Sequence, residues 1–275
     1  MERTVPAAPS DAPASDMGLP DVEGLLDGMP RQRGEATATA TTPARAEPSM
    51  TPAAVAVPSP RLRVPRLWRL FPTPTGTPFT FVYGAVLAVT SLITSYADPD
   101  LVHTLHQASS TDVAHLVRTP VLVLLTSALW IAGGILSPFT LALLVVLTAL
   151  ERRIGGPRTV VVFLLGHVGA TLATEIPIGL AVLVGHLPDS SLHRLDYGVS
   201  FGVAASIGAL AGLLRPWLRW PLLALFGWML VTDLIAFTDP MTNWGHLIAL
   251  TIGVASWPVT RRWCRARVVQ VRRAA

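Results

Sequence analysis

Long apolar segments alternate with short polar ones along most of the chain. They run over residues 79–96, 119–150, 159–184, 197–214, 219–237 and 243–260. A helix needs about 20 residues to cross the roughly 30 Å hydrocarbon core of a bilayer. The pattern therefore predicts an all-α integral membrane protein with six transmembrane helices.

The second apolar segment has a different length from the others. At about 1.5 Å per residue, a single helix over 119–150 would measure about 48 Å, which is too long for one upright span. Gly133, Gly134 and Pro138 interrupt it. We therefore expect residues 119–133 to form an interfacial or partly embedded loop, and the second span to begin near residue 134.

Charge is scarce and concentrated near the two ends of the chain. Charged residues make up 14% of the 275 residues, against about 25% in soluble domains. The composition predicts a disordered Pro/Ala-rich tail over 1–66, a membrane domain over 67–262 and a basic tail over 263–275. The first twenty residues have no apolar stretch, so we expect no signal peptide. Cys264 is the single cysteine, which excludes a disulfide within the chain.

Arginines mark alternate connections between the segments. One set lies at Arg61–Arg69, Arg152–Arg158, Arg215–Arg219 and Arg261–Arg273, whereas the other connections hold only Arg118 and Arg194 among six aspartates. By the positive-inside rule, both termini are expected to be cytoplasmic in a multi-pass plasma-membrane protein. The arginines of 61–69 either contact anionic lipid headgroups or act as a topology signal alone. Their position beside apolar segments argues against nucleic acid as a partner.

Four ionisable residues lie inside the predicted spans, where each is costly and is a functional candidate. Glu175 and Asp233 fall in the outer half. They are expected either to line a polar outer cavity or to hold a proton or ion in a small transporter. His167 is most simply a hydrogen-bonding residue between helices. The histidines of the outer loops are expected to be solvated rather than metal ligands: His103, His106, His115, His186 and His193.

The fourth ionisable residue, His246, has a counterpart at matched depth. In the fourth segment Ser200, Ala204, Gly208 and Gly212 recur every four residues and form a small-residue face. In the sixth, His246 shares a face with Ala249 and Gly253. Such faces let helices approach closely. Each residue alone has a structural explanation, a packing serine and a hydrogen-bonded histidine. Together they satisfy the sequence requirement for a Ser–His catalytic dyad.

At these residues the chain resembles the rhomboid family, specifically its divergent, actinobacterial-type branch. The likeness covers roughly residues 79–260. It rests on a Gly-x-Ser motif at Gly198–Ser200 and on a His followed by small residues in the sixth span. The segments Leu125–Trp130 and Leu150–Gly155 also look similar. The resemblance implies a six-helix rhomboid-like bundle with Ser200 as nucleophile and His246 as base. Gly198, Gly202, Asn243, Ala249 and Gly253 would support the two.

The chain departs from the family pattern in three places. Rhomboid proteases usually carry a His-x-x-x-Asn pair in the second helix that helps to bind the oxyanion. The matching residues 135–141 contain neither, and Ser137 or Thr140 is the available substitute. Phe201 replaces a small residue after the serine, and Ala204 replaces an aromatic residue that stacks under the histidine. Loss of an oxyanion donor costs on the order of 10²–10³ in rate.

Three functions are compatible with these residues. The first is an intramembrane serine protease that cleaves transmembrane substrates near the outer face. The second is a pseudoprotease that binds transmembrane helices as clients without cutting them. The third is a small transporter, which the absence of an inverted repeat disfavours. The sequence predicts no cofactor and no metal, and it predicts the lipid bilayer and a transmembrane protein as partners.

Overall fold

The computed structural model describes residues 70–131, 133–134, 137–237 and 239–274. The regular elements in these ranges are helices: α1 (Pro78–Tyr96), α2 (Pro99–Ala108), α3 (Val113–Arg118), α4 (Pro120–Thr126), η3 (Ser127–Leu129), α5 (Pro138–Ile154), α6 (Gly156–Leu183), η4 (Asp189–His193), α7 (Ser200–Leu213), α8 (Pro216–Ala236), α9 (Pro240–Ala255) and α10 (Trp257–Ala274). The tail predicted over 1–66 lies outside the described residues.

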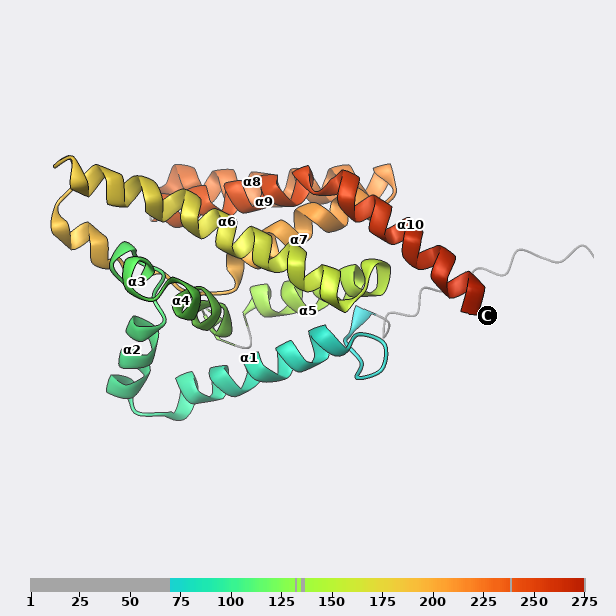
Figure 1. Cartoon of the computed structure of the whole chain (residues 1–275), viewed down its shortest axis with the longest axis horizontal. Helices are drawn as coiled ribbons and strands as arrows, with labels where there is room; N and C mark the ends of the chain where they lie inside the picture. The colour runs from blue at the N-terminus through green and yellow to red at the C-terminus, as the bar shows by residue number, and fades with distance from the viewer. Residues whose placement is uncertain (1–69, 132, 135–136, 238, 275) are drawn as a thin grey trace, which may run out of the picture. The chain divides into compact units, whose positions relative to one another are not determined.

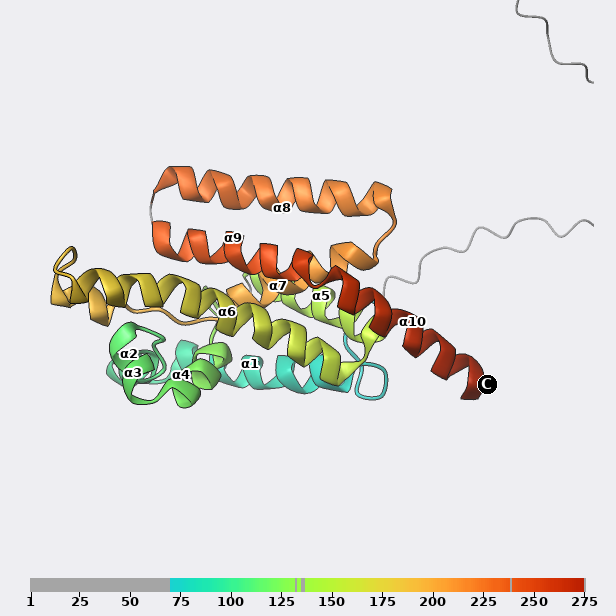
Figure 2. The same cartoon turned by 45° about the horizontal axis from the view of Figure 1, so that its top comes forward.

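The six helices α1 and α5–α9 lie side by side, and successive ones run in opposite directions (Figure 1). At one end α1, α6 and α8 begin, and this end is called the Glu151 end. At the other, the Ser200 end, α5, α7 and α9 begin. Figure 2 shows α10 continuing beyond α9 and diverging from the other helices. The apolar segment predicted over 243–260 is thus shared by two helices, because α9 ends at Ala255.

Helix α7 is the centre of the bundle. Every residue from Phe201 to Gly212 is buried. A Cβ atom on Gly253 would collide with the Ala205 carbonyl oxygen, and one on Gly208 would press on the backbone of α9 at Leu250. The backbones of α7 and α9 therefore touch, which confirms the role predicted for the small-residue faces.

Helix α8 lies at the edge, and Leu230 is its one buried residue (Figure 2). Three helices, α1, α6 and α8, are long and apolar enough to cross a membrane. Helices α5, α7 and α9 have 17, 14 and 16 residues and are shorter than that criterion. The all-helical fold is observed, and the count of six spans remains a prediction.

The second apolar segment is divided as expected. Residues 120–129 form α4 and η3, and α5 begins at Pro138, four residues later than predicted. Ser137 sets this start, because its hydroxyl oxygen accepts the Thr140 N–H at 3.3 Å. Proline at the first helical position suits it as well.

Helix α7 also begins later than predicted, at Ser200 rather than near residue 197. The N–H groups of Gly198 and Val199 donate to the carbonyl oxygens of Ser127 and Trp130, at 3.0 and 3.2 Å. Gly198 has a φ of +131°, a conformation that side chains disfavour. These bonds hold the segment against η3, and α7 therefore begins only at Ser200.

At the Glu151 end, a buried glutamate caps the start of α1. The Glu151 carboxylate accepts the N–H of Phe79 at 3.0 Å, the N–H of Thr80 at 2.8 Å and the Thr80 hydroxyl at 2.7 Å. A helix N-terminus presents unpaired N–H groups and partial positive charge, so a carboxylate is well placed there. Glu151 thereby fixes α1 against α5.

Candidate functional site

A cavity of about 310 Å³ lies at the Ser200 end. Its walls come from α6, from the start of α9 and from the segment that leads into α7. Lining residues that matter for chemistry are Thr111, His167, Thr171, Asp196, Tyr197, Ser200, Phe201, Thr242 and His246. The structure therefore brings Ser200 and His246, the predicted dyad, to one cavity.

Ser200 occupies the first position of α7 and is half-buried. The residue before it, Val199, offers no side chain that could cap the helix. Among the described residues, the N–H groups of Ser200 and Phe201 have no hydrogen-bond acceptor. The cavity is thus bordered by free backbone donors and by the partial positive charge of a helix N-terminus.

His246 lies on α9, and its ring forms a T-shaped contact with the ring of Phe201. The two ring centroids are 5.1 Å apart at an interplanar angle of 77°. Phe201 thus supplies the aromatic contact to the histidine that Ala204 cannot. The His246 Nε2 atom is buried and has no hydrogen-bond partner in the described part of the chain. Ser200 and His246 share the cavity without a hydrogen bond between them there.

His167 and Thr171 lie one turn apart on α6, and both line the cavity. His167 Nε2 is 3.1 Å from the Leu124 carbonyl oxygen and 3.0 Å from the Ser127 hydroxyl. A carbonyl only accepts, so Nε2 carries the proton of the neutral ring and Nδ1 is an acceptor. His167 Nδ1 and Thr171 Oγ1 are both buried without a partner among the described residues. The predicted bond from His167 to a neighbouring helical segment is confirmed.

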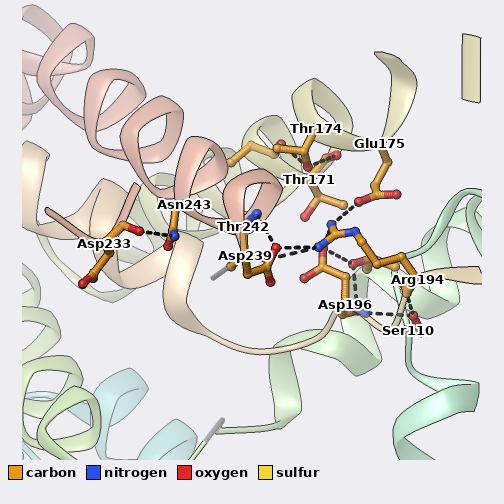
Figure 3. A network of polar contacts seen from close by, with 12 residues as sticks. Ser110, Thr171, Thr174, Glu175, Arg194, Asp196, Asp233, Asp239, Thr242 and Asn243 are labelled. Carbon is orange, nitrogen blue, oxygen red and sulfur yellow. Dashed lines mark hydrogen bonds and ion pairs between the residues drawn. The ribbon is translucent and has the colours of Figure 1, made fainter. Parts of the chain in front are cut away.

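Arg194 joins three elements beside the cavity (Figure 3). Its guanidinium contacts Glu175 of α6 at 2.6 Å and Asp196 at 3.7 Å. It also reaches Asp239 at 3.4 Å and the Thr242 hydroxyl at 3.2 Å, both at the start of α9. Glu175 is 1% exposed. The arginine therefore holds a buried carboxylate and anchors the segment that precedes α7.

Asp196 extends this network to the turn before α3. Its backbone N–H donates to the Ser110 hydroxyl at 3.1 Å, and its carboxylate accepts the Thr111 hydroxyl at 3.2 Å (Figure 3). Burial raises the pKa of Asp196, and the attraction of Arg194 opposes that rise without cancelling it. The segment from Arg194 to Val199 is thus fixed on both sides before it enters α7.

The model of one protein family, described as rhomboid-like protein, matches residues 75–266. The chain belongs to the rhomboid-like protein family. No curated protein and no solved structure matches it. Together with the three apolar helices, this membership identifies a rhomboid-like membrane protein.

Most of the supporting residues expected in this rhomboid-like protein lie at helix contacts. Gly198 alone among them lines the cavity. A Cβ atom on Gly202 would meet the Phe163 ring, and Ala249 is completely buried. The buried Asn243 side chain donates to the Asp233 carbonyl oxygen at 2.9 Å (Figure 3). Gly202, Ala249 and Gly253 therefore set helix spacing, and Asn243 links α9 to α8.

Several expectations about polar residues need correction. Asp233 is exposed on α8 and does not line the cavity, because that helix buries little of its surface. Glu175 does not line this cavity either. It is linked to the cavity through Arg194, whose partners Asp196 and Asp239 are lining residues. Ser137 and Thr140 do not line the cavity either, since they are engaged with each other at the start of α5. His106 is not simply solvated, because it stacks on Tyr197 with centroids 4.2 Å apart.

The sequence interpretation of the rhomboid-like protein assigned no role to Thr171 or to the Arg194 network. A signal for Thr171 was present. His167, Thr171 and Glu175 recur at intervals of four residues in an otherwise apolar segment, and such a spacing marks one polar helix face. Arg194 was visible as an arginine in an otherwise acidic connection. Asp196 is two residues away, but the other two carboxylate partners, Glu175 and Asp239, come from distant positions that only the fold brings together.

Proposed function

We propose that this rhomboid-like protein is an intramembrane serine endopeptidase with Ser200 as nucleophile and His246 as general base. The observation that carries the proposal is the shared cavity, in which a half-buried serine at a helix N-terminus lies with a histidine whose Nε2 atom is buried and unpartnered. In apo states the bond between nucleophile and base is often long, so its absence here is compatible with catalysis.

The reaction follows from these groups. The Ser200 oxygen bonds to the substrate carbonyl carbon while His246 accepts the hydroxyl proton and the carbonyl π electrons move onto oxygen. The protonated imidazole then gives its proton to the amine as the C–N bond breaks, which leaves an acyl-serine. Water attacks this ester, and His246 again accepts and returns the proton. The reaction needs no cofactor.

The same proposal includes an orientation. With α1 and α5–α9 as six spans, the arginine pattern assigns the Glu151 end to the cytoplasm and the Ser200 end to the outer face of the plasma membrane. Substrates would then be transmembrane proteins cut near that face. The exposed apolar residues of α8, including Trp217, Leu225 and Trp228, would face lipid.

A fluorophosphonate probe tests the proposal on purified protein in detergent. Wild type is expected to form a covalent adduct, and Ser200→Ala and His246→Ala are expected to lose it. Ser206→Ala is the matched control, because Ser206 lies on the same helix but is buried and bonded to the Gly202 carbonyl oxygen. Equal labelling of wild type and Ser200→Ala would remove Ser200 as the nucleophile.

Two observations favour the alternative of a pseudoprotease that binds transmembrane helices. Ser200 and His246 are not hydrogen-bonded in the described structure, and the oxyanion pair of the family is missing. A wild-type protein that never labels, cuts no transmembrane substrate and still co-purifies with a transmembrane client would establish this function instead.

A further inference from the structure

The hydroxyl of Thr171 is the unassigned polar group in the Ser200 cavity. Thr171 is 1% exposed, and its Oγ1 atom has no hydrogen-bond partner in the described part of the chain. A hydroxyl that is buried without a partner costs about 1–3 kcal/mol. Native proteins rarely tolerate that cost unless the group is used. Thr171 is itself one of the residues that line the cavity.

The other fully buried polar side chains around the cavity are not free donors. Thr111 donates to Asp196. The hydroxyls of Thr242, which accepts from Arg194, and of Tyr197 are only partly buried, so both can donate to water. His167 Nδ1 is an acceptor in the neutral ring, because Nε2 must donate to the Leu124 carbonyl. His246 is needed unprotonated as the base. Thr171 is therefore the buried hydroxyl donor that remains.

A second feature points to an electron-rich oxygen as the ligand atom. The first N–H groups of α7 are unpaired at the same cavity, and they present partial positive charge. A carbonyl oxygen that becomes negative during attack by Ser200 needs preorganised donors close to it. A hydroxyl from α6 together with the N–H groups of α7 offers donors from two elements.

We propose that the Thr171 hydroxyl donates a hydrogen bond to the substrate carbonyl oxygen during attack by Ser200. This inference rests on the proposed protease function. Thr171 would take the place of the missing His-x-x-x-Asn pair, and it would do so from α6 rather than from α5, the second of the long helices. Proton and electron movements are those of the acylation step, with Thr171 keeping its proton throughout.

The test compares the rate of fluorophosphonate labelling of Ser200 across variants of the full chain. In this reaction the Ser200 oxygen bonds to phosphorus, the P–F bond breaks, and fluoride leaves. The phosphoryl oxygen stands in for the substrate oxyanion. Thr171→Val, which keeps the shape, is expected to lower the limiting labelling rate by about 10²-fold, with little change in the probe concentration for half-saturation. Thr171→Ser keeps the hydroxyl and is expected to restore most of the rate.

Two controls separate a catalytic role from a structural one. Thr174→Val removes a hydroxyl from the same helix that bonds only to the Ala170 and Thr171 carbonyls, and it should label like wild type. Thr171→Ala provides a second hydroxyl-free variant in case Thr171→Val unfolds, as judged by thermal melting. Wild-type labelling rates in folded Thr171→Val or Thr171→Ala would overturn this inference and leave the protease standing. Absence of labelling in wild type would overturn both.

Discussion

Two buried glutamates lie at opposite ends of the bundle, and their surroundings differ. Glu151 and Glu175 are each 1% exposed. From Gly156 at the Glu151 end to Glu175, α6 rises about 29 Å at 1.5 Å per residue, close to the thickness of a hydrocarbon core. Glu151 is held by neutral donors at the start of α1. Glu175 is held by the guanidinium of Arg194, and its Oε2 atom has no partner in the described chain.

The difference separates a structural anchor from the candidate functional site. Both oxygens of Glu151 accept hydrogen bonds, so neither is left without a partner. Nine buried side-chain atoms of the described residues have no partner, and five of them lie near the Ser200 end: Thr171 Oγ1, His167 Nδ1, His246 Nε2, Glu175 Oε2 and Arg194 Nε. Proteins usually satisfy their buried polar groups, and exceptions concentrate at sites that bind something.

The strongest test of this difference between the two glutamates is to remove Arg194, the cation that pairs with Glu175. Arg194→Leu leaves Glu175 buried without a cation, which typically costs 3–5 kcal/mol, and we expect about 3 kcal/mol because Arg194 is partly exposed. Thermal and denaturant unfolding in detergent would measure the loss. The adjacent segment leads into α7, so the labelling of Ser200 is expected to fall as well.

A double variant tests whether the loss comes from the uncompensated charge. Glu175→Gln removes that charge, so Arg194→Leu with Glu175→Gln should be more stable than Arg194→Leu alone. Additive losses in the double variant would mean that the Arg194–Glu175 contact contributes no coupling energy. The charge partner of Glu175 would then not distinguish it from Glu151.

Glu151 is expected to respond differently from Glu175 to substitution by Gln. Glu151→Gln keeps the size but turns one acceptor into an NH₂ group that faces donors of α1, at a cost of about 1–3 kcal/mol. Because its partners are mainly backbone N–H groups, no second substitution should restore the stability.

Thr80→Val removes one of the three donors and is expected to cost about 1 kcal/mol. Ser200 labelling should be unchanged in both. A loss of labelling without loss of stability would contradict the purely structural role.

Much of the fold could be predicted because membrane helices must satisfy their own backbone. The predicted start of the first segment differs from that of α1 by one residue. Ends set by contacts between distant residues were predicted less well. Ser200 begins α7 because Gly198 and Val199 bond to residues 127 and 130, and no local pattern records that pairing.

The site residues also divide into those that a local sequence pattern predicts and those that depend on contacts between distant residues. Ser200 and His246 could be selected because each lies on a small-residue face at similar depth. The aromatic partner of His246 was sought one turn after Ser200, at Ala204, but the fold supplies Phe201. Likewise, Glu151 appeared only as part of a connecting motif. Its capping of α1 depends on residues more than seventy positions away in sequence.

The smallest expected effect is a pH dependence confined to the Ser200 end. His106 of α2 packs between Tyr197 and Trp130. Burial, with a smaller contribution from nearby His103, lowers the pKa of His106. The folded state therefore binds its proton less readily than the unfolded state, whose pKa is about 6.5. The stabilising contribution is complete above that pH and is lost as pH falls through it toward the folded pKa. Between pH 7.5 and 5.5, the melting temperature of wild type should fall slightly more than that of His106→Gln. Asp196 is present in both chains, so its opposite effect cancels. Identical pH profiles would show that His106 is solvated like the exposed His186, whose substitution by Gln is the control.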